Sequence, residues 1–127
     1  TNVVGLAGMT SGLLPLLGGT KGSHIVNISS MGGIPATSKF PGLSAYSSSK
    51  AAVGVLSECL AVEFADKNIS VNALAIGAVQ TEMLEAAFPG YEAPVTPQEF
   101  AEYLYWFSVH GNRFINGKVI PVGTAPV

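Results

Sequence analysis

The fold class is decided by residues 45–76, which read AYSSSKAAVGVLSECLAVEFADKNISVNALAI. Apolar residues recur at helical spacing over residues 45–65, which predicts an amphipathic helix, and Ser44 just before it is the expected N-cap. Residues 69–76 are a short, nearly continuous apolar run, typical of a strand buried on both faces. When helices and strands of this kind alternate along a chain, a parallel sheet with crossover helices is expected.

The same alternation continues toward the N-terminus. Residues 3–17 are small and apolar on all sides, which predicts a buried helix, and residues 24–28 predict a buried strand. Residues 18–22 are expected to form a short surface loop and residues 29–43, rich in Gly, Ser and Pro, a long one. A loop of that length is uncommon in a compact domain unless it has a function.

The alternation also continues toward the C-terminus, with a short helix at 82–88 and a strand at 118–122. Between them, Thr96-Pro97-Gln98-Glu99 combines a Thr cap, Pro at the first helical position and Glu three residues after the cap, and so predicts a helix to about Val109. The whole chain therefore predicts an α/β fold with about three parallel strands. Parallel sheets usually have more strands than three, so we expect residues 1–127 to be a single partial domain.

The composition excludes several classes of protein. With 48% apolar residues the chain is not disordered, and a net charge of −2 argues against a nucleic-acid partner. Only 11% of residues are charged, against about 25% in a typical soluble domain, so much of the surface is expected to face another piece of protein. Residues 1–20 carry no charge, but their glycines and Pro15 make a poor membrane helix, and no membrane partner is expected. Cys59 is the only cysteine, which favours a cytoplasmic location.

Tyr46 and Lys50 are the first candidate catalytic residues. They lie four positions apart in the predicted helix and therefore share a face. A lysine cation near a phenol favours the phenolate, and a tyrosine in that environment can exchange a proton with a substrate oxygen. Taken alone the pair is a weak signal, because an exposed tyrosine and lysine on a solvated helix face fit the same spacing.

Ser29 and Ser30 follow the first predicted strand. Ligands of open α/β sheets gather at the carboxyl ends of the strands, where a hydroxyl can polarise a carbonyl group. A serine in this place also caps its own backbone, and we expect that structural role for one of the two.

Taken together, these segments resemble the short-chain dehydrogenase/reductase family. The resemblance is carried by motifs in one order along the chain, from Asn2 to about Met83. They are Asn2-Val3-Val4-Gly5 and Leu14-Pro15-Leu16-Leu17, the run from His24 to Ser30 with Gly32-Gly33, the Tyr46-x-x-x-Lys50 helix with Ala51-Ala52-Val53, the run Ile69-Ser-Val-Asn-Ala-Leu-Ala, and Gly77 to Met83. The fold that the resemblance implies is the C-terminal half of a Rossmann-like, doubly wound parallel sheet.

The resemblance implies hydride transfer between a nicotinamide cofactor, NAD or NADP, and a small alcohol or carbonyl substrate. Tyr46 would be the general acid/base, and Lys50 would hold the nicotinamide ribose. Ser30 would bind the substrate oxygen, and Asn2 would anchor a water in a proton relay that ends at Lys50. The backbone at Val79 and the hydroxyl of Thr81 would hold the nicotinamide carboxamide. Tyr46 and Gly77 would also contact the cofactor.

The sequence also departs from the family pattern. Ile76 stands where the family has Pro before Gly77. The gap from Ser30 to Tyr46 is sixteen residues, with an insertion expected at 37–41, and the last strand ends Pro121-Val122-Gly123 instead of Asp-Gly-Gly. The Gly-rich turn that binds pyrophosphate in the family's first half does not follow any strand here. We therefore expect that the dinucleotide-binding half is absent and that the 127-residue chain is inactive alone.

Other kinds of site find less support. Ser29 and Ser30 lack a Gly-x-Ser-x-Gly elbow, the residues from Gly18 to Ser23 have the wrong order for a phosphate-binding loop, and no metal site is expected at His24 or His110. Cys59 is expected to be a buried small hydrophobe.

Two readings besides the oxidoreductase stay open: a self-associating fragment and a non-enzymatic scaffold that kept the fold. In family members the two helices that match residues 3–17 and 45–65 pack against a second subunit, so we expect a homo-oligomer through these helices.

Overall fold

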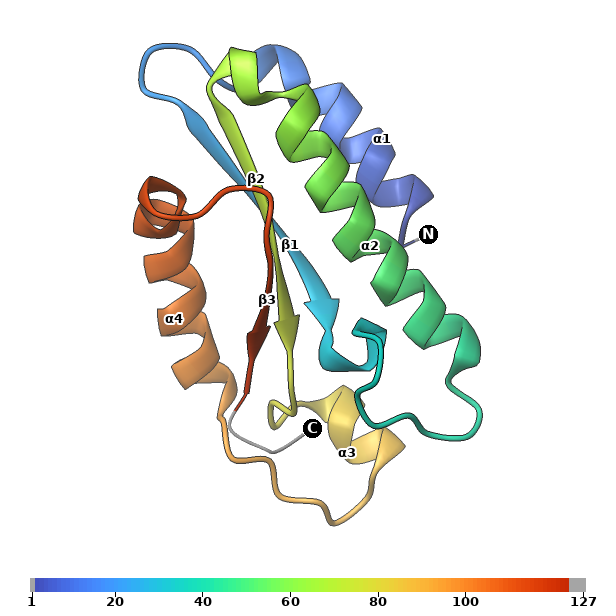
Figure 1. The fold of residues 1–127 in the computed structure, drawn as a ribbon. Coiled ribbons are helices and arrows are strands. Elements are labelled where there is room, and N and C mark those ends of the chain that lie inside the picture. Colours follow the sequence, from blue (N-terminus) through green and yellow to red (C-terminus); the bar gives the residue numbers. More distant parts are fainter. Residues whose placement is uncertain (1, 124–127) are drawn as a thin grey trace.

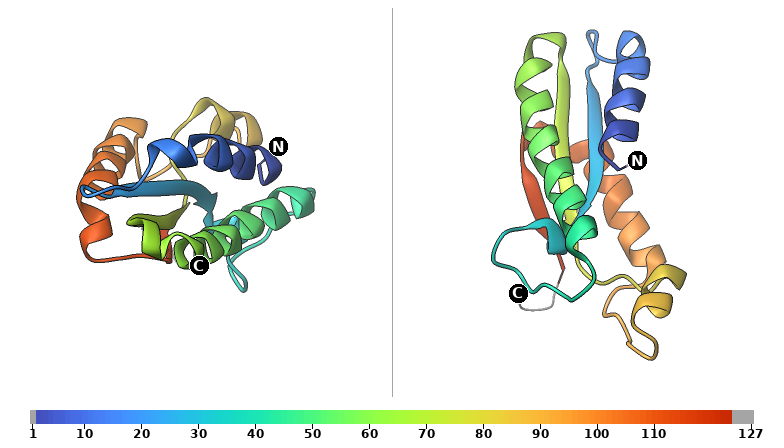
Figure 2. Two further views of the ribbon diagram at one scale, coloured as in Figure 1. Left: turned by 90° about the horizontal axis from the view of Figure 1, so that it is seen from above. Right: turned by 90° about the vertical axis from the view of Figure 1, so that its right-hand side faces the viewer.

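The computed structural model of the chain describes residues 2–123. Three strands, β1 (Ser23–Ser30), β2 (Ile69–Ile76) and β3 (Val119–Val122), form a parallel sheet in the order β1-β2-β3. Helices α1 (Val4–Leu13) and α2 (Ser44–Glu63) lie side by side on one side of the sheet, and α4 (Pro97–His110) lies on the other (Figures 1 and 2). The short helix α3 (Glu82–Ala87) lies beyond the carboxyl ends of the strands. The predicted α/β fold with three parallel strands is confirmed.

The core of the fold lies between β2 and α2. The β2 side chains of Val71, Ala73 and Leu74 have no exposed surface, as expected for a central strand covered on both faces. Helix α2 approaches the sheet closely, since a Cβ atom at Gly54 would lie 3.2 Å from a methyl group of Val119 in β3. The sheet and α2 therefore form one rigid base for the side chains at their ends.

The strand register places the three carboxyl ends at one edge of the sheet. Ser30 pairs with Ile76, and Ile76 pairs with Val122. Because α2 runs back antiparallel to the strands, its N-terminal turns, with Tyr46 and Lys50, lie at the same edge (Figure 1). This edge is where open α/β sheets bind ligands.

Helix α4 is held against the sheet by a partly buried polar network. Nδ1 of His24 lies 3.1 Å from the carbonyl oxygen of Ser108, which only accepts, so Nδ1 carries the proton. Nε2 then accepts from Nδ2 of Asn72 at 2.9 Å. The same Nδ2 donates to the carbonyl oxygen of Ile115, and Oδ1 of Asn72 accepts from the backbone N–H of Lys118. One fully buried amide thus connects β1, β2 and the segment that leads into β3.

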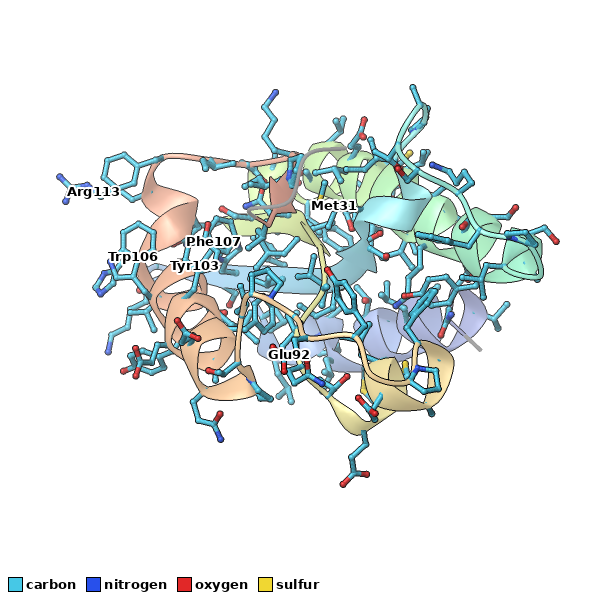
Figure 3. All side chains as sticks on the ribbon, turned by 90° about the horizontal axis from the view of Figure 1, so that it is seen from below. Met31, Glu92, Tyr103, Trp106, Phe107 and Arg113 are labelled. Carbon is cyan, nitrogen blue, oxygen red and sulfur yellow. The ribbon has the colours of Figure 1, made fainter. Side chains whose placement is uncertain are left out.

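The outer side of α4 is aromatic. Figure 3 shows Phe107 directed toward the sheet and Trp106 directed away from it, and the exposed fractions of their side chains are 1% and 49%. Tyr103 stacks on both rings. The helix begins as predicted, with a complete capping box between Thr96 and Glu99 and Pro97 in the first turn. Burial lowers the pKa of His24 below its usual 6.5, and the Ser108 carbonyl opposes this shift to a smaller extent.

Three local expectations were wrong. The N-cap of α2 is Leu43, and Ser44 is the first helical residue and makes no capping bond. The first strand continues through Ser29 and Ser30, because both residues pair with β2. Cys59 is exposed, because it lies two residues after the fully buried Ser57 and so faces away from the sheet.

The N-terminal helix also differs from expectation. It ends at Leu13, and Pro15 follows in a short 3-10 turn because its ring nitrogen cannot donate to the helix. Within the helix only Thr10 is buried, whereas Val4 has 79% of its side chain exposed. The apolar outer side of α1 therefore faces away from the part of the chain that the structure describes.

Candidate active site

Tyr46 and Lys50 lie on one face of α2, as their spacing predicted. The Lys50 ammonium is 5.8 Å from the centroid of the Tyr46 ring, and it donates to the carbonyl oxygen of Ile28 in β1 at 3.4 Å. The Tyr46 side chain is 38% exposed. The cation is thus directed toward the end of the sheet, and the phenol is accessible to a molecule bound there.

Ser29 and Ser30 point in opposite directions and make different bonds. Ser29 is buried, and its hydroxyl donates to the carbonyl oxygen of Lys50 at 2.7 Å. Ser30 accepts from the backbone N–H of Gly32 at 3.2 Å, which caps the 3-10 turn Met31–Gly33. This bond uses an oxygen lone pair of Ser30, so its hydroxyl proton can still be donated to a substrate oxygen. The backbone-capping role expected for one of the two serines is found at Ser30, whereas Ser29 bonds a carbonyl of α2 instead.

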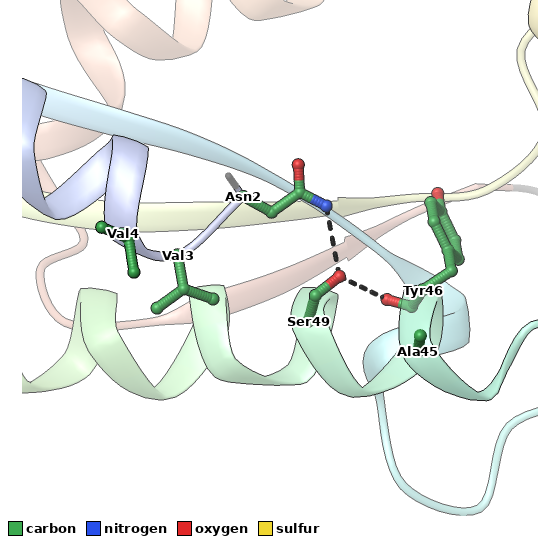
Figure 4. A pocket seen from close by; sticks show the side chains of 6 residues that line it. All are labelled: Asn2, Val3, Val4, Ala45, Tyr46 and Ser49. Atoms are coloured by element: carbon green, nitrogen blue, oxygen red, sulfur yellow. Dashed lines mark hydrogen bonds between the residues drawn. The ribbon is translucent and has the colours of Figure 1, made fainter.

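Asn2 contacts the helix that carries Tyr46. Its Nδ2 donates to Oγ of Ser49 at 3.2 Å, and Ser49 donates to the carbonyl oxygen of Tyr46 at 2.8 Å (Figure 4). A shallow groove of about 390 Å³ lies here, bounded by residues 2–4 of one segment and by Ala45, Tyr46 and Ser49 of the other. Asn2 thus bonds directly to Ser49, the residue that precedes Lys50 in α2.

The segment after β2 forms the far side of the site. Gly77 continues the sheet, with its N–H donating to the carbonyl oxygen of Val122 at 2.7 Å. Val79 forms a parallel bridge with Val95, so the segment is tied to the chain just before α4. Thr81 caps α3 by accepting from the backbone N–H of Leu84 at 3.2 Å, which again leaves the hydroxyl proton for another acceptor.

Two contacts of the site were not predicted from the sequence. Gln80 accepts from the N–H of Ala93 through its side chain and donates to Val95 through its backbone, which fixes the segment after α3. Phe40 in the loop after β1 packs against Phe88 at the end of α3, with ring centroids 5.2 Å apart. Both contacts join segments that are distant in the sequence. The one available signal was that Phe40 is an aromatic residue in a loop otherwise rich in Gly and Ser.

These groups suit proton exchange with an oxygen atom of a bound molecule. Tyr46 supplies an accessible phenol, Ser30 a hydroxyl donor, and Lys50 a fixed cation within reach of the phenol ring. Among residues 2–123 no group of three or more His, Cys, Asp or Glu side chains is placed to bind a metal ion. No helix in this part of the chain is long and apolar enough to cross a membrane.

The family model described as short chain dehydrogenase matches residues 1–92, which include every residue of this site. The chain belongs to the short-chain dehydrogenase family. Among curated short-chain dehydrogenase relatives, protein FixR of Bradyrhizobium diazoefficiens is 34% identical over 95% of this chain. A protein named as an NAD-dependent oxidoreductase of Mycobacterium tuberculosis is 32% identical over 80% of it.

The fold of the chain is also similar to that of solved structures of short-chain dehydrogenases. The complex of RhlG with NADP from Pseudomonas aeruginosa matches with a TM-score of 0.78 and 28% identity over 96% of this chain. The chain spans 45% of the length of FixR, 42% of the Mycobacterium protein and 53% of the RhlG chain. It therefore spans about half the length of the relatives it matches.

Proposed function

We propose that the whole protein that contains this chain transfers a hydride between a nicotinamide cofactor and an alcohol or carbonyl substrate. The observation that carries the proposal is the Tyr46–Lys50 pair, which lies at the carboxyl edge of the sheet beside the turn capped by Ser30. The relatives named above support it, since one is named an NAD-dependent oxidoreductase and another was solved with NADP.

The residues present fit the nicotinamide end of such a cofactor. Lys50 offers ammonium protons to ribose hydroxyls, and Thr81 keeps a hydroxyl proton for the carboxamide beside the backbone at Gly77 and Val79. When bound, the cofactor supplies or accepts the hydride. For the pyrophosphate, residues 2–123 offer no Gly-x-x-x-Gly-x-Gly turn between a strand and a helix. We therefore infer that the 127-residue chain needs a dinucleotide-binding half for turnover.

In the proposed mechanism each side chain has a separate task. Ser30 donates its hydroxyl proton to the substrate oxygen and orients it. In the reductive direction Tyr46 gives its phenolic proton to that oxygen, and in the oxidative direction its phenolate removes the proton. The Lys50 cation, 5.8 Å from the centroid of the Tyr46 ring, is placed to interact with charge that develops on the reacting oxygens. Asn2 and Ser49 fix the start of α1 against the turn that carries Tyr46, where a water relay would begin.

The test is a comparison of two tyrosine variants of the whole protein. Oxidation of NADH and NADPH would be followed with a panel of ketones and aldehydes. Tyr46→Phe should lower kcat by about 10²- to 10⁴-fold, the usual contribution of a general acid. Tyr103→Phe is the control, because Tyr103 on α4 has the same exposed fraction of 38%. Equal activity of the Tyr46→Phe variant and the unmutated protein would refute the proposal.

The exposed face of α1 and α2 favours a second property, self-association. Large apolar side chains with more than half of their surface exposed gather on these helices and on the 3-10 turn after α1; they are Val4, Met9, Leu16, Val55 and Val62. Exposed patches of this kind mark protein contacts. We propose that the protein forms a homo-oligomer through α1 and α2, with or without the catalytic activity.

A further inference from the structure

The peptide that carries Lys50 is held by β1 through a buried hydrogen bond. The hydroxyl of Ser29, only 3% exposed, donates to the carbonyl oxygen of Lys50 at 2.7 Å. In an α-helix this carbonyl already accepts from the N–H four residues later, so Ser29 adds a second donor to a group that needs none for helix formation. The bond therefore fixes the position of this turn of α2 relative to the end of β1.

The turn after β1 touches the same peptide from another direction. A Cβ atom at Gly33 would lie 2.7 Å from the backbone nitrogen of Ala51, 2.8 Å from the carbonyl carbon of Lys50 and 2.9 Å from its Cβ. Real Cβ atoms essentially never lie this close to other atoms. The φ angle of Gly33 is not in the left-handed region, so glycine is required here by space alone.

These two contacts act on the residues of the candidate site. Ser29 precedes Ser30 directly in β1, so a bond from Ser29 to Lys50 sets the distance between Ser30 and the helix that carries Tyr46. Rotation or sliding of α2 would break the Ser29 bond or drive Lys50 into Gly33. The Lys50 ammonium donates to the carbonyl oxygen of Ile28 in β1, so this bond also depends on the position of α2 relative to β1.

We infer that Ser29 and Gly33 are positioning residues: together they clamp the Lys50 peptide so that Lys50 and Tyr46 face Ser30 in a fixed geometry. The inference rests on the proposed function for its catalytic consequence. The clamp itself concerns only the attachment of α2 to β1, so it can be measured without turnover.

A second tie between the same two elements provides a matched control. Nδ2 of Asn27 donates to Oγ of Ser57 at 2.8 Å, and both residues are buried. This tie also joins β1 to α2, but Ser57 lies seven residues, about two helical turns, after Lys50. Ser57→Ala should therefore loosen the same pair of elements away from the site.

The first measurement is hydrogen–deuterium exchange of the whole protein and of the variants Ser29→Ala, Gly33→Ala and Ser57→Ala. The first two variants should exchange faster within residues 46–54, and Ser57→Ala should do so mainly beyond residue 54. If Ser29→Ala and Ser57→Ala raise exchange in the same residues, or Ser29→Ala leaves 46–54 unchanged, the clamp is refuted.

The second measurement is kinetic. Ser29→Ala and Gly33→Ala should lower kcat/KM by about 10- to 100-fold, the cost of a catalytic group misplaced by a fraction of an ångström to 1 Å. They should also displace the pH dependence of kcat, whereas Ser57→Ala should keep the pH profile of the unmutated protein. An unchanged profile in Ser29→Ala would overturn the catalytic consequence. If the unmutated protein shows no turnover, the proposed function is refuted. The hydrogen–deuterium exchange result would still show whether Ser29 and Gly33 hold the Lys50 peptide.

Discussion

The two adjacent serines at the end of β1 have separate tasks because a strand turns successive side chains to opposite faces. The Ser29 hydroxyl points toward α2 and donates its proton to the Lys50 carbonyl oxygen. The Ser30 hydroxyl points toward the following turn and accepts from the backbone N–H of Gly32. At the scale of single residues, the direction of a hydroxyl proton thus decides which serine can bind a substrate. Only Ser30 keeps its proton for that purpose.

Ser30→Ala should therefore lower kcat of the whole protein by about 10²-fold, the effect of removing one preorganised donor to a reacting oxygen. Its effect on the free energy of unfolding should stay within about 0.5–1.5 kcal/mol, because one hydrogen bond of a half-buried serine is lost. Steady-state kinetics and urea denaturation measure the two quantities. Ser38→Ala, at an exposed loop position, is the control. A Ser30→Ala enzyme with kcat within twofold of the unmutated value would exclude substrate binding by Ser30.

At the scale of the elements, α4 depends on a neutral histidine. The neutral form of His24 donates from Nδ1 and accepts at Nε2, and a proton on Nε2 would face the amide protons of Asn72. Because burial lowers the pKa of His24 in the folded state, the unfolded state binds more protons as the pH falls below 6.5. The stability that this residue contributes is fully present above pH 6.5 and is lost as the pH falls through the folded-state pKa.

The variant His24→Phe should accordingly flatten the pH dependence of the free energy of unfolding below pH 6.5. At neutral pH it should be less stable by about 1–3 kcal/mol, because Asn72 loses a partner while buried. Urea denaturation between pH 5 and pH 8 measures both effects. An identical slope in the variant and the unmutated protein over this range would show that His24 does not couple α4 to pH. Glu99 also has a lowered pKa, through its bonds with Thr96, but it titrates at more acidic pH.

The start of α4 offers a second test at this scale. Thr96→Ala removes the acceptor for the N–H of Glu99 at 3.2 Å and half of the capping box. The free energy of unfolding should fall by about 1 kcal/mol, the usual cost of losing such a cap. Thr20→Ala, in an exposed loop, should leave it unchanged in the same denaturation experiment. A Thr96→Ala variant as stable as the control would mean that the cap does not contribute to the stability of α4.

Elements were predictable from the sequence wherever local chemistry decides them. The capping box at Thr96 and the apolar run of β2 gave a helix and a strand with nearly correct bounds. Ser44 was wrong because the helix begins at the residue that was expected to cap it. The Tyr46–Lys50 face follows from helical periodicity, but the contacts of Ser29, Gly33 and Gln80 depend on how distant segments pack.

At the scale of the whole molecule, the low content of charged residues, 11%, is reflected in the exposed apolar side chains of α1 and α2. The predicted burial of residues 3–17 was wrong for this chain alone, because within residues 2–123 nothing lies against the outer side of α1. Val55 and Val62 of α2 are 60% and 79% exposed, on the same side of the sheet as α1. A second subunit would bury this surface and supply the missing contacts.

Val55→Glu should therefore shift the whole protein toward smaller assemblies, because a carboxylate at a buried apolar contact is costly. Multi-angle light scattering after gel filtration measures the mass directly. Val109→Glu is the control, since Val109 lies on α4, across the sheet, and is 52% exposed. Equal masses for the two variants, or a monomeric unmutated protein, would exclude an interface through α2.

Transfer of deuterium from a labelled cofactor tests the proposed hydride transfer most directly. The whole protein would be given NADH or NADPH with both hydrogens at C4 of the nicotinamide replaced by deuterium, together with a carbonyl substrate. The proposed function predicts one deuterium on the carbinol carbon of the alcohol, formed about 10²- to 10⁴-fold more slowly by Tyr46→Phe. An alcohol without deuterium, or one that Tyr46→Phe forms at the unmutated rate, would contradict it.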